Sequence, residues 1–348
     1  MSFKKAHLDL FWGPHLVLNA GLKSDLPSLE KRNKPFDGVF ISTRNRPDFV
    51  EQVLGQTGLQ NLDVTVLATD PSDIRHQTLE KFRPSVIFLS ELSPSLKAIA
   101  SAGELPFEFP LVAKSGWDIW QKRNLILHLA QSREYRNILI LDDDVLGLTP
   151  ELVMKMSMDL RSHKISGLYF EGNPDHSLVG GLIYRFTGQR RRFLGSACLA
   201  MRLGQVTQPK FLNLYNEDWF FMFGNESGNV ISSGSLVQDN YPRVYQAENL
   251  IAQECGDLIA EFWRYLRIKQ SFKPGLESFE ELIQHRISLV NDLKDAVWKS
   301  EMRSKEELAS LEELKVYLVA LRPEVLSKLF YAVLDRYGIR PENFKRIA

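Results

Sequence analysis

Short apolar runs recur through the first half of the chain, and each of them ends at a polar or proline-containing segment. Apolar runs of about four to six residues that are bounded by turn residues are typical of strands buried on both faces of a parallel sheet. The clearest runs are at residues 38–42, 63–68, 85–89 and 137–141. We therefore predict four buried strands in this part of the chain.

Segments with helical character separate the predicted strands. Pro47 suits the first turn of a helix, because the N–H that proline lacks would be unpaired at that position anyway. Residues 117–129 read as a second helix, and Thr149 followed by Pro150 marks the start of a third. This alternation predicts an α/β fold, with a mostly parallel sheet that is flanked by helices on both faces.

Beyond about residue 265 the pattern becomes purely helical. Apolar residues keep helical spacing there, and Ser278 with Glu281 and Ser304 with Glu307 form capping-box patterns. We predict a C-terminal α-helical subdomain, whose apolar stripes form a hydrophobic core. The predicted division of the chain is an N-terminal extension at 1–35, an α/β domain at 36–265 and the helical subdomain at 266–348.

Composition excludes several classes of function. The 348 residues include 43 Lys and Arg and 43 Asp and Glu, so the net charge is zero and gives no general attraction to nucleic acid or membranes. Cys198 and Cys255 are too few for a disulfide framework or a thiolate zinc site. No apolar run approaches the roughly 20 residues that a membrane span needs, and the N-terminus does not read as a signal peptide. We expect a cytoplasmic protein without a membrane span.

Three consecutive aspartates, Asp142, Asp143 and Asp144, follow the fourth apolar run directly. Like charges at the end of a buried strand repel one another, and a bound cation removes that repulsion. Mg²⁺ and Mn²⁺ prefer oxygen ligands, and commonly join one or two carboxylates to phosphate groups. Because alternate residues of an extended segment share a face, Asp142 and Asp144 are expected to point into one cleft while Asp143 turns away and tolerates substitution best. A solvated acidic turn is the alternative.

Four segments resemble glycosyltransferases of the family 2 type, which have the GT-A fold. Residues 40–47 (FISTRNRP) resemble the opening strand and loop, and residues 122–124 (KRN) resemble the helix segment that precedes the DxD strand. Residues 141–144 (LDDD) resemble the DxD motif, and residues 216–219 (NEDW) resemble the acidic segment of the acceptor half. The resemblance implies a nucleotide-sugar half at about 36–145 and an acceptor half at about 146–265.

The resemblance also implies roles for individual residues. Asp144 and Asp142 would hold a Mn²⁺ or Mg²⁺ ion that bridges the diphosphate of a nucleoside-diphosphate sugar. Contacts with the nucleotide-sugar would come from Thr43, Arg44, Arg46, Asp70, Arg123, Asp142 and Asp143. Asp218 would be the base that removes the acceptor hydroxyl proton during an inverting transfer, and Glu217 would orient a hydroxyl or cap a helix.

Two other functions stay open on the sequence. The first is a sugar-nucleotidyltransferase of related fold, although the loop at 42–46 lacks the glycines that such enzymes carry after the first strand. The second is a non-catalytic protein that binds nucleotide-sugars. Surface ion pairing is the alternative role for Arg46 and Arg123. The sequence leaves the acceptor unspecified, and the C-terminal helices could form a homo-oligomer interface as readily as a lid.

Overall fold

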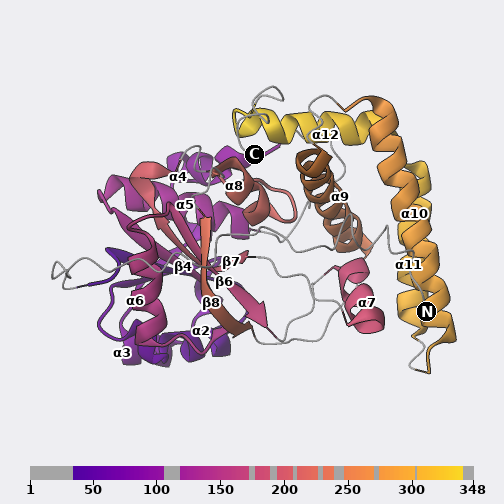
Figure 1. Cartoon of the computed structure of the whole chain (residues 1–348). Helices are drawn as coiled ribbons and strands as arrows, with labels where there is room; N and C mark the ends of the chain where they lie inside the picture. The colour runs from indigo at the N-terminus through magenta and orange to yellow at the C-terminus, as the bar shows by residue number, and fades with distance from the viewer. Residues whose placement is uncertain are drawn as a thin grey trace.

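The computed structural model of the chain places an α/β sheet beside a set of long C-terminal helices (Figure 1). It describes residues 34–105, 118–171, 177–188, 194–206, 210–225, 230–238, 247–269, 274–301 and 304–339. The predicted N-terminal extension therefore lies almost wholly outside the described residues.

The described strands form one sheet in the order β3-β2-β1-β4-β7-β6-β8-β5. Its first half consists of β1 (Gly38–Thr43), β2 (Val64–Ala68), β3 (Ser85–Phe88) and β4 (Asn137–Asp142). These four strands are parallel to their neighbours, β1 pairing with both β2 and β4, and β2 with β3. All four predicted strands are thus confirmed, and their carboxyl ends lie along one edge of the sheet.

The second half of the sheet is mixed. Its strands are β5 (Val145–Leu146), β6 (Ile165–Glu171), β7 (Leu194–Arg202) and β8 (Val230–Gln238). Strand β7 is antiparallel to β4 and β6, β6 is parallel to β8, and β5 is antiparallel to β8. The predicted fold class, a mostly parallel sheet flanked by helices, is confirmed for the described part of the chain.

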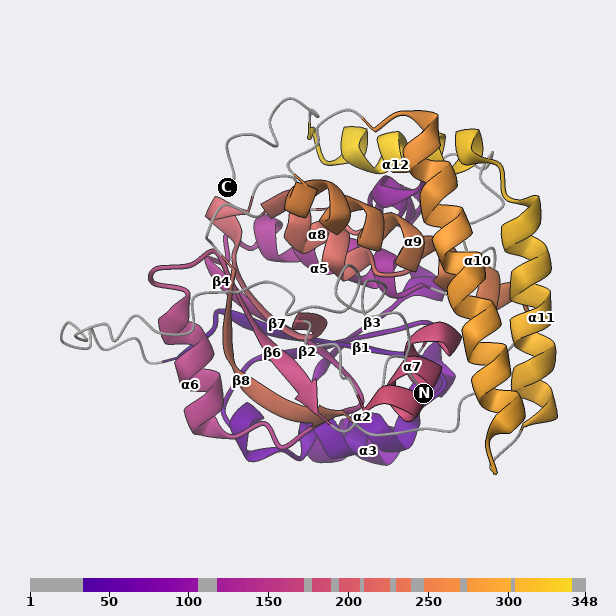
Figure 2. The same cartoon turned by 45° about the vertical axis from the view of Figure 1, so that its right-hand side comes forward.

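Helices cover both faces of the sheet, α5 and α8 on one face and α2 and α3 on the other (Figures 1 and 2). The helices of this part are α2 (Pro47–Leu54), α3 (His76–Phe82), α4 (Pro94–Ala100), α5 (Ile119–Ser132), α6 (Pro150–Asp159), α7 (Leu178–Thr187) and α8 (Glu217–Asn225). As predicted, Pro47 begins α2 and Pro150 begins α6, and the Thr149 side chain caps α6 by accepting from the Leu152 N–H. Short 3-10 turns are η1 (Thr57–Leu59), η2 (Pro71–Asp73), η3 (Leu89–Glu91), η4 (Ser101–Gly103) and η5 (Leu203–Gln205).

Successive side chains of the central strands pack alternately into two separate hydrophobic cores. On β4, Ile140 packs into the core beneath α5 and α8, whereas Leu139 and Leu141 pack into the core beneath α2 and α6. All three are fully buried. The sheet is therefore enclosed on both faces, and its polar chemistry is confined to the strand ends.

Four long helices form the C-terminal part: α9 (Ala247–Lys269), α10 (Leu276–Lys299), α11 (Lys305–Ala320) and α12 (Pro323–Arg336). Ser304 caps α11 as predicted, by accepting from the Glu307 N–H, but α10 begins before Ser278 and has Gly275 at its N-cap. The apolar stripes of these helices belong to the same core as α5 and α8, so the helical part packs onto the sheet without a break. Helix α9 runs across the predicted boundary at residue 265.

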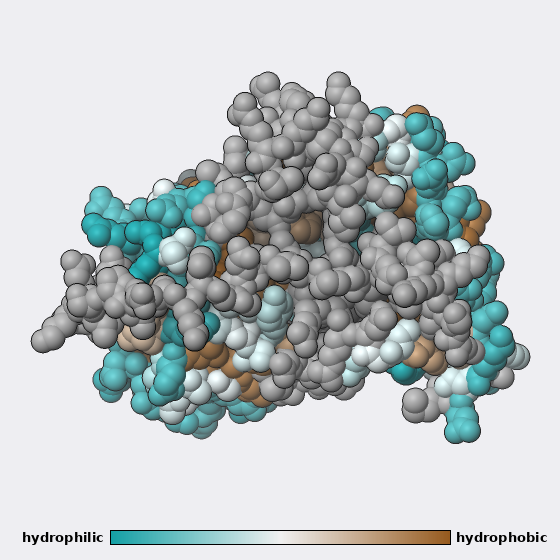
Figure 3. Space-filling view, viewed as in Figure 1, coloured by the Kyte–Doolittle hydropathy of each residue, from teal (hydrophilic) through white to brown (hydrophobic). Residues whose placement is uncertain are grey.

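The outer edge of the helical part, over α10 and α11, is mostly hydrophilic in the view of Figure 3. Among the helices of the described residues, none combines the length and apolar character that crossing a membrane requires. The cytoplasmic location and the formation of a homo-oligomer are not tested by the structure and stay predictions.

Candidate functional site

Most of the predicted site residues meet at the carboxyl edge of β1, β2 and β4. Thr43 is the last residue of β1 and pairs with Ala68 on β2, so that Asp70 follows close by. On the other side of β1, Ser42 pairs with Asp142, the last residue of β4. This is the edge at which open α/β sheets bind their ligands.

Asp143 and Asp144 lie beyond the end of β4 and are both fully buried. Arg46 binds both of them: Nη2 is 2.8 Å from Asp143 Oδ1, and Nη1 is 3.2 Å from Asp144 Oδ2. The Thr43 hydroxyl also donates to Asp143 Oδ2 at 2.6 Å. Burial raises the pKa of Asp143 to about 7, although the charge of Arg46 opposes that rise.

The expectation that Asp143 turns away from the site is wrong. Because β4 ends at Asp142, the two following aspartates are in a turn, where side chains no longer alternate between two faces. Asp143 instead points inward to Thr43 and Arg46, and Asp142 is the most exposed of the three, with 19% of its side chain accessible. Replacing Asp143 would remove the partner of a buried hydroxyl.

Arg123 connects the acidic strand end to the acidic segment of α8. It is buried on α5, and its Nη2 donates to both carboxylate oxygens of Asp142, at 3.0 and 3.2 Å. Its Nη1 donates to Glu217, and its guanidinium lies 5.6 Å from the centre of the Phe211 ring. The site therefore contains a buried cation between two carboxyl groups that are far apart in the sequence.

Lys122 is a buried residue of the site whose role was not visible in the sequence, where it stands only as part of the KRN segment. Its buried ammonium group donates to the Thr43 carbonyl oxygen at 2.6 Å, to Thr69 Oγ1 at 2.9 Å and to Asp118 Oδ1 at 2.9 Å. Thr69 donates in turn to Asp118. Burial lowers the pKa of Lys122, and the Asp118 carboxylate opposes that change. These contacts tie the ends of β1 and β2 to α5.

Asp73 is a second residue that sequence reasoning missed. Its buried carboxylate accepts from the backbone N–H of Asn45 at 2.7 Å and from that of Thr69 at 2.6 Å, and so joins the loops after β1 and β2. Asn45 has a φ of 54°, a left-handed conformation that asparagine tolerates better than most residues. The nearby polar Thr-Asp-Pro-Ser segment indicated a turn, but nothing in it singled out Asp73.

Asp70 and Arg44 lie at the open end of the same loops. Asp70 caps η2 by accepting from the Ser72 N–H at 2.9 Å, and its hydrogen bonds with Ser72 lower its pKa. Within the described residues, the half-buried Arg44 side chain makes no hydrogen bond or ion pair, and its charge also lowers the pKa of Asp70. A ligand at this end of the loops could therefore accept hydrogen bonds from Arg44 and donate them to Asp70.

Glu217 and Asp218 begin α8, but their environments differ. Glu217 is buried against Arg123, whereas Asp218 is partly exposed and accepts from the Trp219 N–H at 2.9 Å. Asn216, directly before them, has a φ of 64°, and its side-chain amide donates to the buried Asp257 on α9 at 2.8 Å. The C-terminal helices thus anchor the segment that carries both acidic residues.

Burial raises the pKa of Glu217 to about 8 from its ordinary value of 4.5, and Arg123 only partly opposes this. The folded state therefore holds this proton more tightly than the unfolded state, so the group contributes stability that is complete below its unfolded pKa and is lost as the pH rises to about 8. We expect the free energy of unfolding to fall more between about pH 5 and pH 8 in the wild type than in Glu217→Gln. Urea unfolding across this range measures the difference.

The exposed Glu280 on α10 supplies the control, because Glu280→Gln should leave the wild-type slope unchanged. Parallel stability curves for wild type and Glu217→Gln would show that Glu217 does not take up a proton in this range.

A metal ion at this edge would depend on ligands from outside the protein. Within the described part of the chain, no three His, Cys, Asp or Glu side chains are grouped so that they could hold a metal ion by themselves. Carboxylate oxygens from Asp142 and Asp144 are nonetheless the donor type that Mg²⁺ and Mn²⁺ prefer, and such ions commonly take their remaining ligands from phosphates and water. The donor set therefore fits a hard cation that arrives with a phosphate group.

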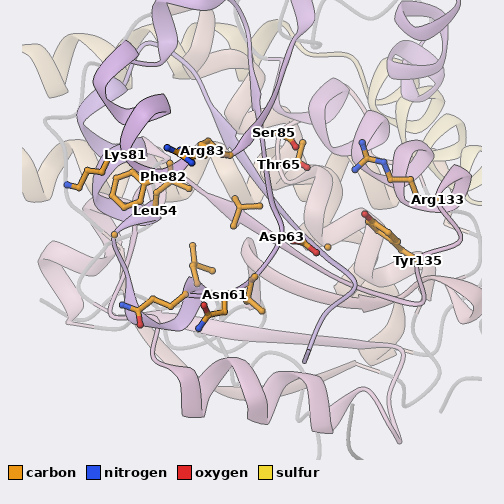
Figure 4. Close-up of a pocket in the computed structure, with 17 residues that line it drawn as sticks. Leu54, Asn61, Asp63, Thr65, Lys81, Phe82, Arg83, Ser85, Arg133 and Tyr135 are labelled. Atoms are coloured by element: carbon orange, nitrogen blue, oxygen red, sulfur yellow. The ribbon is translucent and has the colours of Figure 1, made fainter. Parts of the chain in front are cut away.

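A cavity of about 550 Å³ lies at the opposite edge of the sheet, at the amino ends of β1, β2 and β3 (Figure 4). Its lining includes Gly38, Asp63 and Ser85 from this edge, and Arg83 and Arg133 lie apart from each other on different sides of it (Figure 4). The cationic side chains do not converge, and none of the predicted site residues lines it. The acidic edge remains the candidate site.

No family model matches the chain, and neither does any curated protein. Among solved structures, glucosyl-3-phosphoglycerate synthase from Mycobacterium tuberculosis, with Mn²⁺, UDP-glucose and phosphoglyceric acid, is 14% identical at a TM-score of 0.42, covering 66% of this chain and 79% of its own. A mannosyltransferase from Pyrobaculum calidifontis, in complex with GDP-mannose and Mn²⁺, is 12% identical at a TM-score of 0.43. The match covers 86% of this chain and 85% of the mannosyltransferase chain.

A 4-diphosphocytidyl-2C-methyl-D-erythritol synthase from Anaerococcus prevotii also matches, at 12% identity and a TM-score of 0.32, covering 62% of this chain and 96% of its own. These identities and TM-scores are low for all three structures. The fold assignment therefore rests on the strand order and strand directions described above.

Proposed function

We propose that this protein is a metal-dependent glycosyltransferase, which moves a sugar from a nucleoside-diphosphate sugar to an acceptor hydroxyl with inversion. The observation that carries the proposal is the buried contact of Arg123 with both Asp142 and Glu217. The segments around these carboxyl groups resemble the DxD motif and the acidic acceptor-half segment of family 2 glycosyltransferases. One guanidinium contacts both segments, which supports the proposal that they act together.

On this proposal the carboxyl edge of the sheet holds the donor. Asp144 and Asp142 would hold Mn²⁺ or Mg²⁺, and Thr43, Arg44 and Asp70 would line the nucleotide pocket. A bound divalent cation stabilises the charge that develops on a departing nucleoside diphosphate. Asp143 positions the Thr43 hydroxyl, and Arg123 positions Asp142.

The acceptor is activated by Asp218. Its carboxylate takes the proton of the acceptor hydroxyl as that oxygen attacks the anomeric carbon, and the bond from that carbon to the diphosphate oxygen breaks. The electron pair of the broken bond leaves with the nucleoside diphosphate. Glu217 is buried against Arg123 and so acts as a positioning residue in this scheme.

The donor site is tested by nucleotide binding. We expect UDP or GDP to bind the wild type more tightly when Mn²⁺ is present, and Asp144→Asn to lose this dependence on Mn²⁺, because the amide removes a negatively charged cation ligand. Isothermal titration calorimetry with and without Mn²⁺ measures both effects. If neither UDP, GDP nor other nucleoside diphosphates bound with Mn²⁺, the donor site would be wrongly assigned.

Asp63→Asn is the matched control, since Asp63 is 70% exposed at the opposite edge of the sheet and pairs with Lys34. It removes the same charge from the protein without touching the acidic edge. Thermal unfolding of both variants distinguishes the loss of a cation-binding side chain from a loss of folding. The titration of Asp144→Asn is informative only if this variant remains folded at the titration temperature.

A further inference from the structure

Arg46 contributes a positive charge that contacts both of the buried aspartates that follow β4. It lies within 2.8 Å of Asp143 and 3.2 Å of Asp144, whose side chains are 0% and 1% exposed. The Arg46 side chain itself is 32% exposed. The guanidinium therefore lies on the solvent side of the carboxylates that it neutralises.

Arg46 lies at the start of a helix, where its guanidinium is partly exposed to solvent. It is the N-cap residue of α2, on the loop after β1, and its side chain makes no capping hydrogen bond there. Its guanidinium lies 5.8 Å from the centre of the Phe49 ring, beside the site. Arginine binds phosphate oxygens as well as it binds carboxylates, so a diphosphate offers it an equivalent partner.

Buried carboxylates without a counter-charge are strongly unfavourable. A divalent cation bound at Asp144 would supply that counter-charge, and two positive groups cannot share the same carboxylate oxygens without repulsion. Arg46 and the cation therefore compete for Asp144 as long as no other anion is present.

We propose that Arg46 is a resident counter-ion, which neutralises Asp143 and Asp144 in the metal-free protein and transfers to the diphosphate when the cation and the nucleotide bind together. This inference rests on the proposed function, and adds an order of events to it. The cation alone binds weakly because it must displace Arg46. With a nucleoside diphosphate present, the displaced guanidinium gains a new anionic partner, so the two ligands bind cooperatively.

The test measures Mn²⁺ binding in the absence of nucleotide, by the electron paramagnetic resonance signal of free Mn²⁺. We expect Arg46→Met to bind Mn²⁺ alone about tenfold more tightly than the wild type, within the range typical of coupled sites. Arg46→Lys keeps the positive charge and should stay close to the wild type. Adding UDP or GDP should tighten Mn²⁺ binding in the wild type by more than in Arg46→Met.

Arg75→Met is the matched control, because Arg75 is a surface residue that pairs with Asp48 at 2.6 Å and its loss changes the net charge equally. It should not change Mn²⁺ affinity by more than about twofold, given the screening of surface charges. Thermal unfolding confirms that each variant is folded at the temperature of the measurement.

Equal or weaker binding of Mn²⁺ alone by Arg46→Met would overturn the proposal, and so would an absence of binding by both proteins. Failure of the proposed function gives a different result. In that case no nucleotide tightens Mn²⁺ binding in the wild type, while the comparison of Mn²⁺ alone still reports whether Arg46 occupies the cation position.

Discussion

Asp218→Asn is expected to remove sugar transfer while leaving Mn²⁺-dependent nucleotide binding at the wild-type level. The amide cannot take the proton of the acceptor hydroxyl, and loss of a general base lowers rates by about 10²- to 10⁴-fold. The substitution can keep one local hydrogen bond, because the amide oxygen can still accept from the Trp219 N–H as the carboxylate does at 2.9 Å. The measurements are nucleoside diphosphate release with an acceptor found by screening, and nucleotide affinity by calorimetry.

Asp295→Asn controls for the general effect of removing an exposed carboxylate, since Asp295 lies on the exposed side of α10. Full transfer activity of Asp218→Asn with the correct acceptor would disprove the role of Asp218 as base. A matching loss of nucleotide affinity would instead assign Asp218 to the donor site.

Arg123→Met is expected to have the largest effect on stability, lowering the free energy of unfolding by about 3–5 kcal/mol. The substitution keeps much of the side-chain volume but leaves the Asp142 carboxylate without its cation, and the buried Glu217, which is mostly protonated at neutral pH, without its hydrogen-bond partner. Removing one partner of a buried charged group is strongly destabilising, because the remaining charge is then uncompensated. Urea unfolding monitored by tryptophan fluorescence measures the change.

Arg133→Met is a matched control at the end of the same helix. Arg133 is exposed at the C-cap of α5, where its guanidinium lies 6.0 Å from the centre of the Tyr135 ring, and its loss should cost no more than about 1 kcal/mol. If the two variants unfolded at the same urea concentration, the contact of Arg123 with Asp142 and Glu217 would not stabilise the fold.

The parallel half of the sheet could be predicted from sequence because burial on both faces leaves uninterrupted apolar runs, such as Ile138 to Leu141 before the aspartates. The second, mixed half of the sheet could not be predicted in this way. Strand β8 reads VISSGSLVQ, which is rich in serine and glycine, and forms a strand because β5 and β6 pair with it. Strand formation of this kind depends on neighbours more than on intrinsic preference.

The acidic residues of the site could be predicted because their excess charge after a buried strand needs compensation. The polar network that supports them was not visible, since it joins residues distant in sequence, such as Lys122 with the carbonyl of Thr43. The orientation of Asp143 was missed for a local reason. The alternation of side chains holds only while the strand continues, and β4 ends at Asp142, one residue before Asp143.

The contact between α9 and the segment before α8 restricts how this protein can vary. A Cβ atom at Gly256 would lie 2.3 Å from the Tyr215 carbonyl oxygen, and the next residue, Asp257, holds the Asn216 side chain. Substitutions at Gly256 and Asp257 should therefore be tolerated only together with compensating changes around Asn216. A chimera that exchanged the C-terminal helices for those of another protein would need to import both segments together.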